Sequence, residues 1–211
     1  MKDNVKAVVF DVGNVLLRWD PRNLYRKIFK SVEQMEWFLC HVCDGPWNEA
    51  QDRGRTWADA VQERTKTFPQ WTAEIRAYDE RWMETLDGAI EENVNVLRAL
   101  KQANVPVYAI TNFSKEKFHA ARAQFGFFDL FEGIVVSGEE QLIKPDPRIF
   151  RLFLDRYQLS ATACMFVDDS LANVAAAKEI GMRTIHYEEG LDLAAALDRH
   201  GITMRQDAQT A

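Results

Sequence analysis

The chain has few cysteines. Three cysteines among 211 residues leave at least one thiol unpaired, so a disulfide framework is not expected. Cys40 and Cys43 enclose His41 in a C-H-V-C pair, but a structural zinc needs four ligands and the sequence holds no second pair. We therefore interpret the pair as thiols on a helix rather than as a metal or redox site.

Long apolar runs and an excess of positive charge are also missing. No stretch approaches the roughly 18 apolar residues of a membrane span, and no signal-peptide pattern precedes the first predicted strand, which predicts a cytoplasmic protein without a membrane partner. The 26 Lys and Arg against 32 Asp and Glu give a net charge of −6, which offers no long-range attraction for nucleic acid. Binding of a small anion through a metal ion is not excluded by this charge.

What is present is the composition of a globular protein, with 47% hydrophobic and 27% charged residues. The length allows one core with an insertion or two small units at about 150 residues per domain. Internal repeats and low-complexity tracts are absent, and the last residues, 206–211, are expected to fray.

Short apolar runs predict the strands of the core. The three strongest cover 5–10, 105–110 and 163–167, and weaker ones cover 133–136 and 182–186. Helix-length segments separate them, and strands joined by such crossovers form a parallel sheet with helices on both faces. The sequence therefore predicts an α/β fold.

Residues 20–86 depart from this alternation. They contain no convincing strand, and their helix-start signals are Asp20-Pro21, Ser31 with Gln34, Thr56 with Asp59, and Phe68-Pro69. All six tryptophans lie in or beside this segment: Trp19, Trp37, Trp47, Trp57, Trp71 and Trp82. We interpret the segment as an inserted helical bundle, and its aromatic residues as bundle packing more than as a substrate pocket.

Later helix starts follow the core strands. Asp146-Pro147 predicts a helix that runs to about Tyr157, and Ser114 and Ser170 are predicted N-caps.

Four groups of reactive residues follow core strands or precede a core helix. They are Asp11 with Gly13 two residues later, Thr111-Asn112, Lys144 in K-P-D-P, and the adjacent acids Asp168-Asp169. The carboxyl ends of parallel strands meet at one edge of the sheet, where ligands bind in open α/β folds. Two carboxylates at such an apolar edge repel each other and need a cation, and ligands that are all oxygen favour magnesium.

The order of these groups resembles the haloacid dehalogenase superfamily, with Asp11 in DVGNV, Thr111 in ITNFS, Lys144 in KPDP, and Asp168 in FVDDS. This resemblance implies a Rossmann-like core at 1–17 and 88–211 with an inserted helical cap at 18–87. The segment 47–54 (WNEAQDRG) is similar to a cap motif of the glucose-1-phosphate phosphatase-like group, whose first motif is DxGN. The expected activity is therefore phosphatase chemistry on a small, sugar-phosphate-like monoester.

These residues suit phosphoryl transfer. Asp11 is the expected nucleophile that forms an aspartyl-phosphate, and Asp11, the Gly13 carbonyl, Asp168 and Asp169 are the expected ligands of Mg²⁺. Lys144 is expected to neutralise a phosphoryl oxygen and to keep Asp11 ionised. Thr111 and Asn112, with backbone N–H groups around Gly13, are expected to bind the other phosphoryl oxygens.

Gly13 departs from the commonest phosphatase pattern, which has a second Asp at this position to protonate the leaving oxygen. Without this general acid, the rate is expected to fall by about 10²- to 10⁴-fold. The substrate then carries a better leaving group, such as an anomeric sugar oxygen, or another acid replaces the missing one. The candidates are Asp20, Glu49, Asp52 and His41.

Two other readings stay open. A 2-haloacid dehalogenase-type hydrolase also lacks an Asp at position 13, but adjacent acids such as Asp168 and Asp169 would repel a haloacid carboxylate. A non-catalytic regulatory protein would bind phosphate and magnesium without turnover. The oligomeric state, monomer or homodimer, is left open.

Overall fold

The central element is a parallel sheet of five strands. The computed structural model describes residues 5–204. The strand order is β5-β4-β1-β6-β7, and every neighbouring pair is parallel. The strands are β1 (Ala7–Phe10), β4 (Val107–Thr111), β5 (Gly133–Val136), β6 (Cys164–Asp168) and β7 (Arg183–His186). The five predicted strands and the α/β fold class are therefore confirmed, and the predicted frayed end, 206–211, lies outside the described residues.

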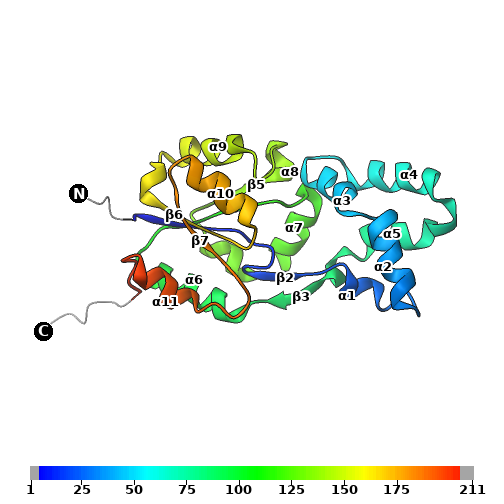
Figure 1. The fold of residues 1–211 in the computed structure, drawn as a ribbon, viewed down its shortest axis with the longest axis horizontal. Coiled ribbons are helices and arrows are strands. Elements are labelled where there is room, and N and C mark those ends of the chain that lie inside the picture. Colours follow the sequence, from blue (N-terminus) through cyan, green and yellow to red (C-terminus); the bar gives the residue numbers. More distant parts are fainter. Residues whose placement is uncertain (1–4, 205–211) are drawn as a thin grey trace, which may run out of the picture.

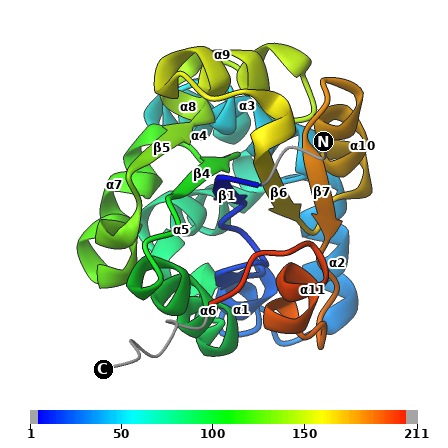
Figure 2. The ribbon, with the colours of Figure 1, turned by 90° about the vertical axis from the view of Figure 1, so that its left-hand side faces the viewer.

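Helices cover both faces of this sheet (Figure 2). Alternate residues of β1 point to opposite sides, so Val8 and Phe10 belong to one apolar cluster and Ala7 and Val9 to another. The first face carries α6 (Glu91–Gln102), α7 (Lys115–Gln124) and α11 (Leu193–Arg199), and the second carries α9 (Pro147–Tyr157) and α10 (Leu171–Glu179). Burial on both faces explains why these strands are continuous apolar runs rather than alternating ones.

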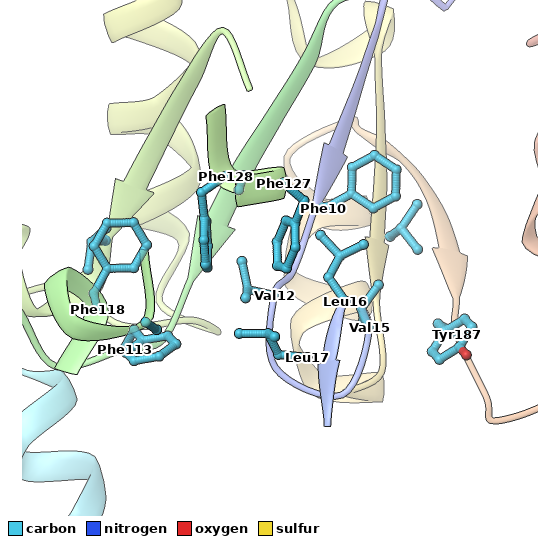
Figure 3. Packing of buried hydrophobic residues seen from close by; sticks show 14 of the residues in the cluster. Phe10, Val12, Val15, Leu16, Leu17, Phe113, Phe118, Phe127, Phe128 and Tyr187 are labelled. Atoms are coloured by element: carbon cyan, nitrogen blue, oxygen red, sulfur yellow. The ribbon is translucent and has the colours of Figure 1, made fainter. Parts of the chain in front are cut away.

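The first cluster extends beyond the sheet. It includes residues after β1, such as Val12 and Leu17, and part of it is shown in Figure 3. It also includes Phe38 and Tyr78 from the helical segment. The core and the helical segment therefore share one continuous apolar interior.

A two-stranded antiparallel sheet joins the core to the helical segment. It consists of β2 (Leu17–Trp19) and β3 (Leu86–Ala89), with Leu17 opposite Ala89 and Trp19 opposite Leu86. The sequence did not predict these strands, because three or four residues are too few to show a period. Each strand is also stabilised mainly by a partner about 70 residues away in the chain.

Helices α2 to α5 lie at the end of the molecule toward which the carboxyl ends of the core strands point (Figure 1). The helices of this segment are α1 (Arg22–Tyr25), α2 (Val32–His41), α3 (Gly45–Asp52), α4 (Trp57–Thr67) and α5 (Thr72–Glu80). The predicted caps of α2 and α4 are present, since Ser31 accepts from the Gln34 N–H and Thr56 from the Asp59 N–H. Phe68-Pro69 starts a 3-10 turn, Pro69–Trp71, before α5 rather than an α-helix.

Short helical turns complete the element order. They are η2 (Trp82–Thr85), η3 (Gly126–Leu130), α8 (Ser137–Glu140) and η4 (Ala161–Ala163). The predicted helix after Asp146-Pro147 is confirmed as α9, which ends at Tyr157. Ser114 and Ser170 occupy the N-cap positions of α7 and α10, but neither side chain accepts a capping bond. The domain boundaries at 17/18 and 87/88 stay a prediction.

The three cysteines are free thiols in different surroundings. Cys40 on α2 is exposed, whereas Cys43, after the end of α2, and Cys164 on β6 are buried. Burial raises the pKa of Cys43 to about 12 and that of Cys164 to about 11. Among the described residues, the one group of side chains that could hold a metal ion consists of Asp11, Asp168 and Asp169 and includes no cysteine.

Candidate active site

Asp11 lies directly after β1 at the carboxyl edge of the sheet. Its backbone N–H donates to the Val167 carbonyl of the neighbouring β6 at 2.8 Å, so the two strands stay paired as far as the acid. The Val12 N–H donates to Asp11 Oδ1 at 2.7 Å and orients the carboxylate. Asp11 is 8% exposed, which leaves an edge of it open toward a ligand.

Lys144 joins the ends of β1 and β6. Its Nζ lies 2.7 Å from Asp11 Oδ1 and 2.7 Å from Asp168 Oδ2, and the Lys144 and Asp168 side chains are fully buried. The Lys144 backbone is held in turn by Asn112, which donates to its carbonyl at 2.9 Å and accepts from its N–H at 2.8 Å. The two residues predicted from separate motifs therefore form one unit.

This arrangement changes the interpretation of Asn112. One N–H and the carbonyl oxygen of its side-chain amide hold the Lys144 backbone, so Asn112 positions Lys144. The contact with substrate that the sequence predicted for Asn112 stays a prediction. Thr111 differs from it, because its hydroxyl is buried and, within residues 5–204, has no hydrogen-bond partner. A buried hydroxyl without a partner is costly, and a ligand oxygen at the sheet edge would satisfy it.

Asp168 carries a second support that the sequence did not indicate. Asn173 on α10 donates to both of its carboxylate oxygens, at 3.0 and 3.1 Å, and the Ser170 N–H donates to Oδ1 at 2.8 Å. Asn173 follows Asp168 by five residues, as expected for the first turn of a helix that begins after the strand. No residue-type signal distinguishes it from an ordinary helix asparagine.

Three carboxylates meet at this edge. Asp11, Asp168 and Asp169 each offer an oxygen, and the three oxygens lie within 4.8 Å of one another. Burial raises the pKa of Asp11 to about 7; Lys144 opposes this shift and Asp168 adds to it. Burial and Asp168 also raise the pKa of Asp169.

The single positive charge of Lys144 does not balance the negative charges of these three carboxylates. Burial lowers the pKa of Lys144, but Asp11 and Asp168 outweigh it, so the net shift is upward and Lys144 stays charged. Three carboxylates against one ammonium leave excess negative charge in a poorly solvated place. All donors are oxygens, so the cluster fits a hard divalent ion such as Mg²⁺.

A pocket opens beside the acids, between the core and the helical segment. Gly13, Asn112 and Ser114 line it from the core, and Asn48 and Asp52 line it from α3. Its remaining lining residues are apolar: Leu17, Trp19, Trp57, Trp82, Leu86 and Phe113. Three of the six tryptophans thus line a pocket, while Trp47 packs edge-on against Trp57 in the interior of the helical segment.

Asp52 is the one candidate for the missing acid that lines this pocket. Burial raises its pKa to about 7, the Ser114 backbone N–H opposes this shift, and the charges of Glu49 and Asp11 add to it. Glu49 itself pairs with Arg53 on the exposed side of α3.

The two other candidate acids lie elsewhere. Asp20 bonds Arg22 and lines a neighbouring polar pocket together with Asn14 and Asp169. His41 is exposed and stacks on Trp37.

The comparisons with known proteins show the family of this chain. The haloacid dehalogenase-like hydrolase family matches residues 5–181, and the chain belongs to this family of enzymes. Sesquiterpene phosphatase astK of Aspergillus oryzae is 31% identical over 198 residues, which cover 88% of this chain and 91% of that protein. Phosphoglycolate phosphatase of Pectobacterium atrosepticum is 27% identical over 151 residues, or 70% of this chain and 62% of that protein.

The fold also matches solved structures of the same family. A HAD family enzyme from Bacteroides thetaiotaomicron, crystallised as a magnesium complex, aligns with a TM-score of 0.74 at 19% identity. The alignment covers 92% of this chain and 99% of that one. In residues 5–204, no helix combines the length and the apolar character that crossing a bilayer requires.

Proposed function

We propose that the chain is a magnesium-dependent phosphatase that hydrolyses a small phosphomonoester through an aspartyl-phosphate on Asp11. The observation that carries this proposal is the placement of Asp11 and Asp168 on either side of the buried Lys144 ammonium, with Asp169 beside them. The phosphatase relatives support it, although their names differ in the alcohol, a sesquiterpene in one and glycolate in the other. Their names therefore leave the class of alcohol open.

Asp11, Asp168, Asp169 and the Gly13 carbonyl are the proposed ligands of Mg²⁺. When bound, the ion supplies positive charge between a carboxylate nucleophile and an anionic ester. Asp168 is held for this task by Asn173 and the Ser170 N–H.

The proposed reaction has two displacements at phosphorus. Asp11 attacks in line and forms an acyl-phosphate bond, while the ester P–O bond breaks and the alcohol leaves. Water then attacks the same phosphorus, which releases inorganic phosphate and regenerates the Asp11 carboxylate. Lys144 neutralises a phosphoryl oxygen and the Thr111 hydroxyl donates to another, where charge spreads in the transition state.

Asp52 is proposed to protonate the leaving alcohol in the place of the side chain that Gly13 lacks. Its support is its position in the pocket beside Gly13 and a pKa raised to about 7, which keeps part of the population protonated at neutral pH. Asp52 lies in the segment proposed as a cap domain, 18–87, and its carboxylate already accepts from the Ser114 backbone N–H of the core.

The test of the proposed function is a magnesium-dependent phosphate-release screen with Asp11→Asn as the blank. We expect turnover in the parent chain and a loss of at least about 10³-fold in the variant. Undiminished hydrolysis by Asp11→Asn would place the nucleophile elsewhere. Halide release from 2-haloacids without metal would make the chain a dehalogenase, and phosphate and Mg²⁺ binding without any turnover would make it a regulatory protein.

The proposed acid is tested on two leaving groups. Asp52→Asn should lower kcat on an alkyl phosphate by about 10² or more and leave kcat on 4-nitrophenyl phosphate nearly unchanged, because nitrophenolate leaves without a proton. Glu49→Gln on the same helix, with its ion pair to Arg53, is the matched control. Its charge only adds to the pKa shift of Asp52, so it should lower kcat on the alkyl phosphate far less than Asp52→Asn does. Equal losses of Asp52→Asn on both substrates would contradict the assignment.

A further inference from the structure

The pocket beside the acids has apolar walls drawn from both parts of the molecule. Leu17 and Trp19 come from β2, Leu86 from β3, and Trp82 from the turn before β3. Trp57 begins α4 and Phe113 follows β4, so four separate stretches of the chain contribute apolar side chains.

The pocket starts where a phosphate would be bound. Gly13 lies two residues after Asp11 and Asn112 one residue after Thr111, and both line the pocket. The organic part of an ester whose phosphorus faces Asp11 would therefore extend between these apolar walls.

Most polar groups of the pocket already have protein partners. The Ser114 hydroxyl accepts from the Trp57 indole N–H at 2.8 Å, and the Asn112 amide is bonded twice to the Lys144 backbone. What remains for a ligand is the Ser114 hydroxyl proton, the second Asn112 N–H and the Asn48 and Asp52 side chains, against six apolar side chains. A polyol bound here would place hydroxyls against these apolar walls, which is unfavourable in a poorly solvated place.

Gly13 leaves further room at the start of the pocket. A Cβ built on Gly13 would contact nothing within 4 Å, and Gly13 is not among the residues with positive φ. The backbone thus does not require glycine at this position. The absence of a side chain keeps space open beside the phosphate site.

We infer that the pocket holds a hydrocarbon alcohol, so that the preferred substrates are alkyl or aryl phosphomonoesters rather than sugar or polyol phosphates. The inference rests on the proposed phosphatase function and replaces the sugar-like alcohol expected from the sequence. The cavity volume of about 90 Å³ is smaller than the roughly 150 Å³ that suffices for benzene, so the walls enclose the first few carbons of the chain. Longer groups would continue out of the open side.

The first experiment compares kcat/KM for propyl phosphate and glycerol 1-phosphate in the presence of Mg²⁺. The two esters share three carbons and a primary leaving oxygen and differ by two hydroxyls. We expect propyl phosphate to be favoured by at least about tenfold. Along methyl, ethyl and propyl phosphate, kcat/KM should rise about fourfold per methylene. Equal or higher values for glycerol 1-phosphate, or a preference for glucose 1-phosphate over hexyl phosphate, would overturn the inference.

A matched pair of variants locates the effect. Leu86→Asn, in the pocket wall, should reduce the gain per methylene to less than about twofold. Leu152→Asn removes another half-buried leucine, on α9 at the far face of the sheet, and should leave the gain unchanged. An undiminished gain in Leu86→Asn would place the alcohol elsewhere.

A binding measurement separates this inference from the proposed function. Calorimetry with propylphosphonate and 2,3-dihydroxypropylphosphonate, which cannot be hydrolysed, should show at least about tenfold tighter binding of the former. Such a preference without hydrolysis of any ester would support the apolar pocket and overturn the phosphatase. Equal binding of the two phosphonates would overturn the pocket assignment even if esters are hydrolysed.

Discussion

Lys144 balances the charge of two buried carboxylates, so its replacement should lower stability as well as activity. In metal-free protein, Lys144→Met leaves Asp11 and Asp168 unpaired, and we expect a loss of about 3–5 kcal/mol in the free energy of unfolding. Mg²⁺ would bind between the same acids, so it should raise the Tm of the variant more than that of the parent chain.

The measurement is thermal unfolding in EDTA and in excess Mg²⁺. Lys101→Met is the control, because Lys101 pairs with Glu132 at the surface and its loss should cost less than about 1 kcal/mol. An equal response of both variants to Mg²⁺ would contradict a metal site at these acids.

The raised pKa of Asp52 predicts how stability depends on pH. Its pKa is about 7 in the folded chain and about 3.9 when unfolded, so between these values the folded state binds the extra proton. The stability from this group is present below about pH 4 and is lost as the pH rises toward 7. The loss is at most about 4 kcal/mol, reduced by the solvent that reaches the partly exposed carboxylate.

Asp52→Asn removes this titration, so its stability should fall less than that of the parent chain between pH 4.5 and 7.5. Urea unfolding in EDTA at the two pH values gives the comparison. Asp11, whose pKa is also raised to about 7, titrates in both proteins, so the difference between the two declines is what Asp52 accounts for. A parallel decline in both proteins would show that Asp52 does not hold a proton in the folded state.

The sequence predicted the site residues at strand ends but missed the residues that hold those side chains in place. Asp11, Thr111 and Asp168 could be predicted because the end of an apolar strand is visible in the sequence. Asn173 could not, since it is distinguished only by the carboxylate that it contacts. The sequence also could not single out Asp52 among the four candidate acids. That choice depends on which face of α3 packs against the core, and the sequence of α3 alone does not show which face this is.

The N-terminus of α4 positions a pocket residue, whereas that of α2 does not. Thr56 caps α4 directly before Trp57, and Ser31 caps α2 away from the pocket. Thr56→Ala and Ser31→Ala should each cost about 1 kcal/mol of stability. Only Thr56→Ala should also raise KM, by severalfold, because it loosens the Trp57 contacts with Ser114 and Glu116. Equal KM values for Thr56→Ala and Ser31→Ala would show that the N-cap residue Thr56 does not affect the pocket.

Elements were predictable where their period or cap lies within the element itself. The core strands and the caps at Ser31, Thr56 and Asp146 are of this kind. The strands β2 and β3 are not, because Leu17 pairs with Ala89 across the whole helical segment. The 3-10 turn after Phe68 shows the same limit, since a proline start signal does not choose between helix types.

At the scale of the whole molecule, the shared apolar interior predicts cooperative unfolding. One cluster runs from Val8 and Phe10 in the sheet to Phe38 and Tyr78 in the helical segment, and Trp82 packs on Phe113 between them. All six tryptophans lie between residues 19 and 82, so their fluorescence reports mainly on the helical segment, whereas far-UV circular dichroism reports on all helices.

The two signals should therefore give one superimposable denaturant transition. Lys117→Met, which removes the ion pair of Lys117 with Asp79 between α7 and α5, should lower the midpoint of both signals together. A fluorescence transition that precedes the dichroism transition would mean that the helical segment unfolds by itself.

The different surroundings of the three cysteines provide a labelling site without any substitution. Cys40 is accessible on α2, and the buried thiols of Cys43 and Cys164 resist deprotonation at neutral pH. A maleimide dye or spin label added to the native chain would attach at Cys40 alone. Its signal would report on the surroundings of α2 during denaturant unfolding.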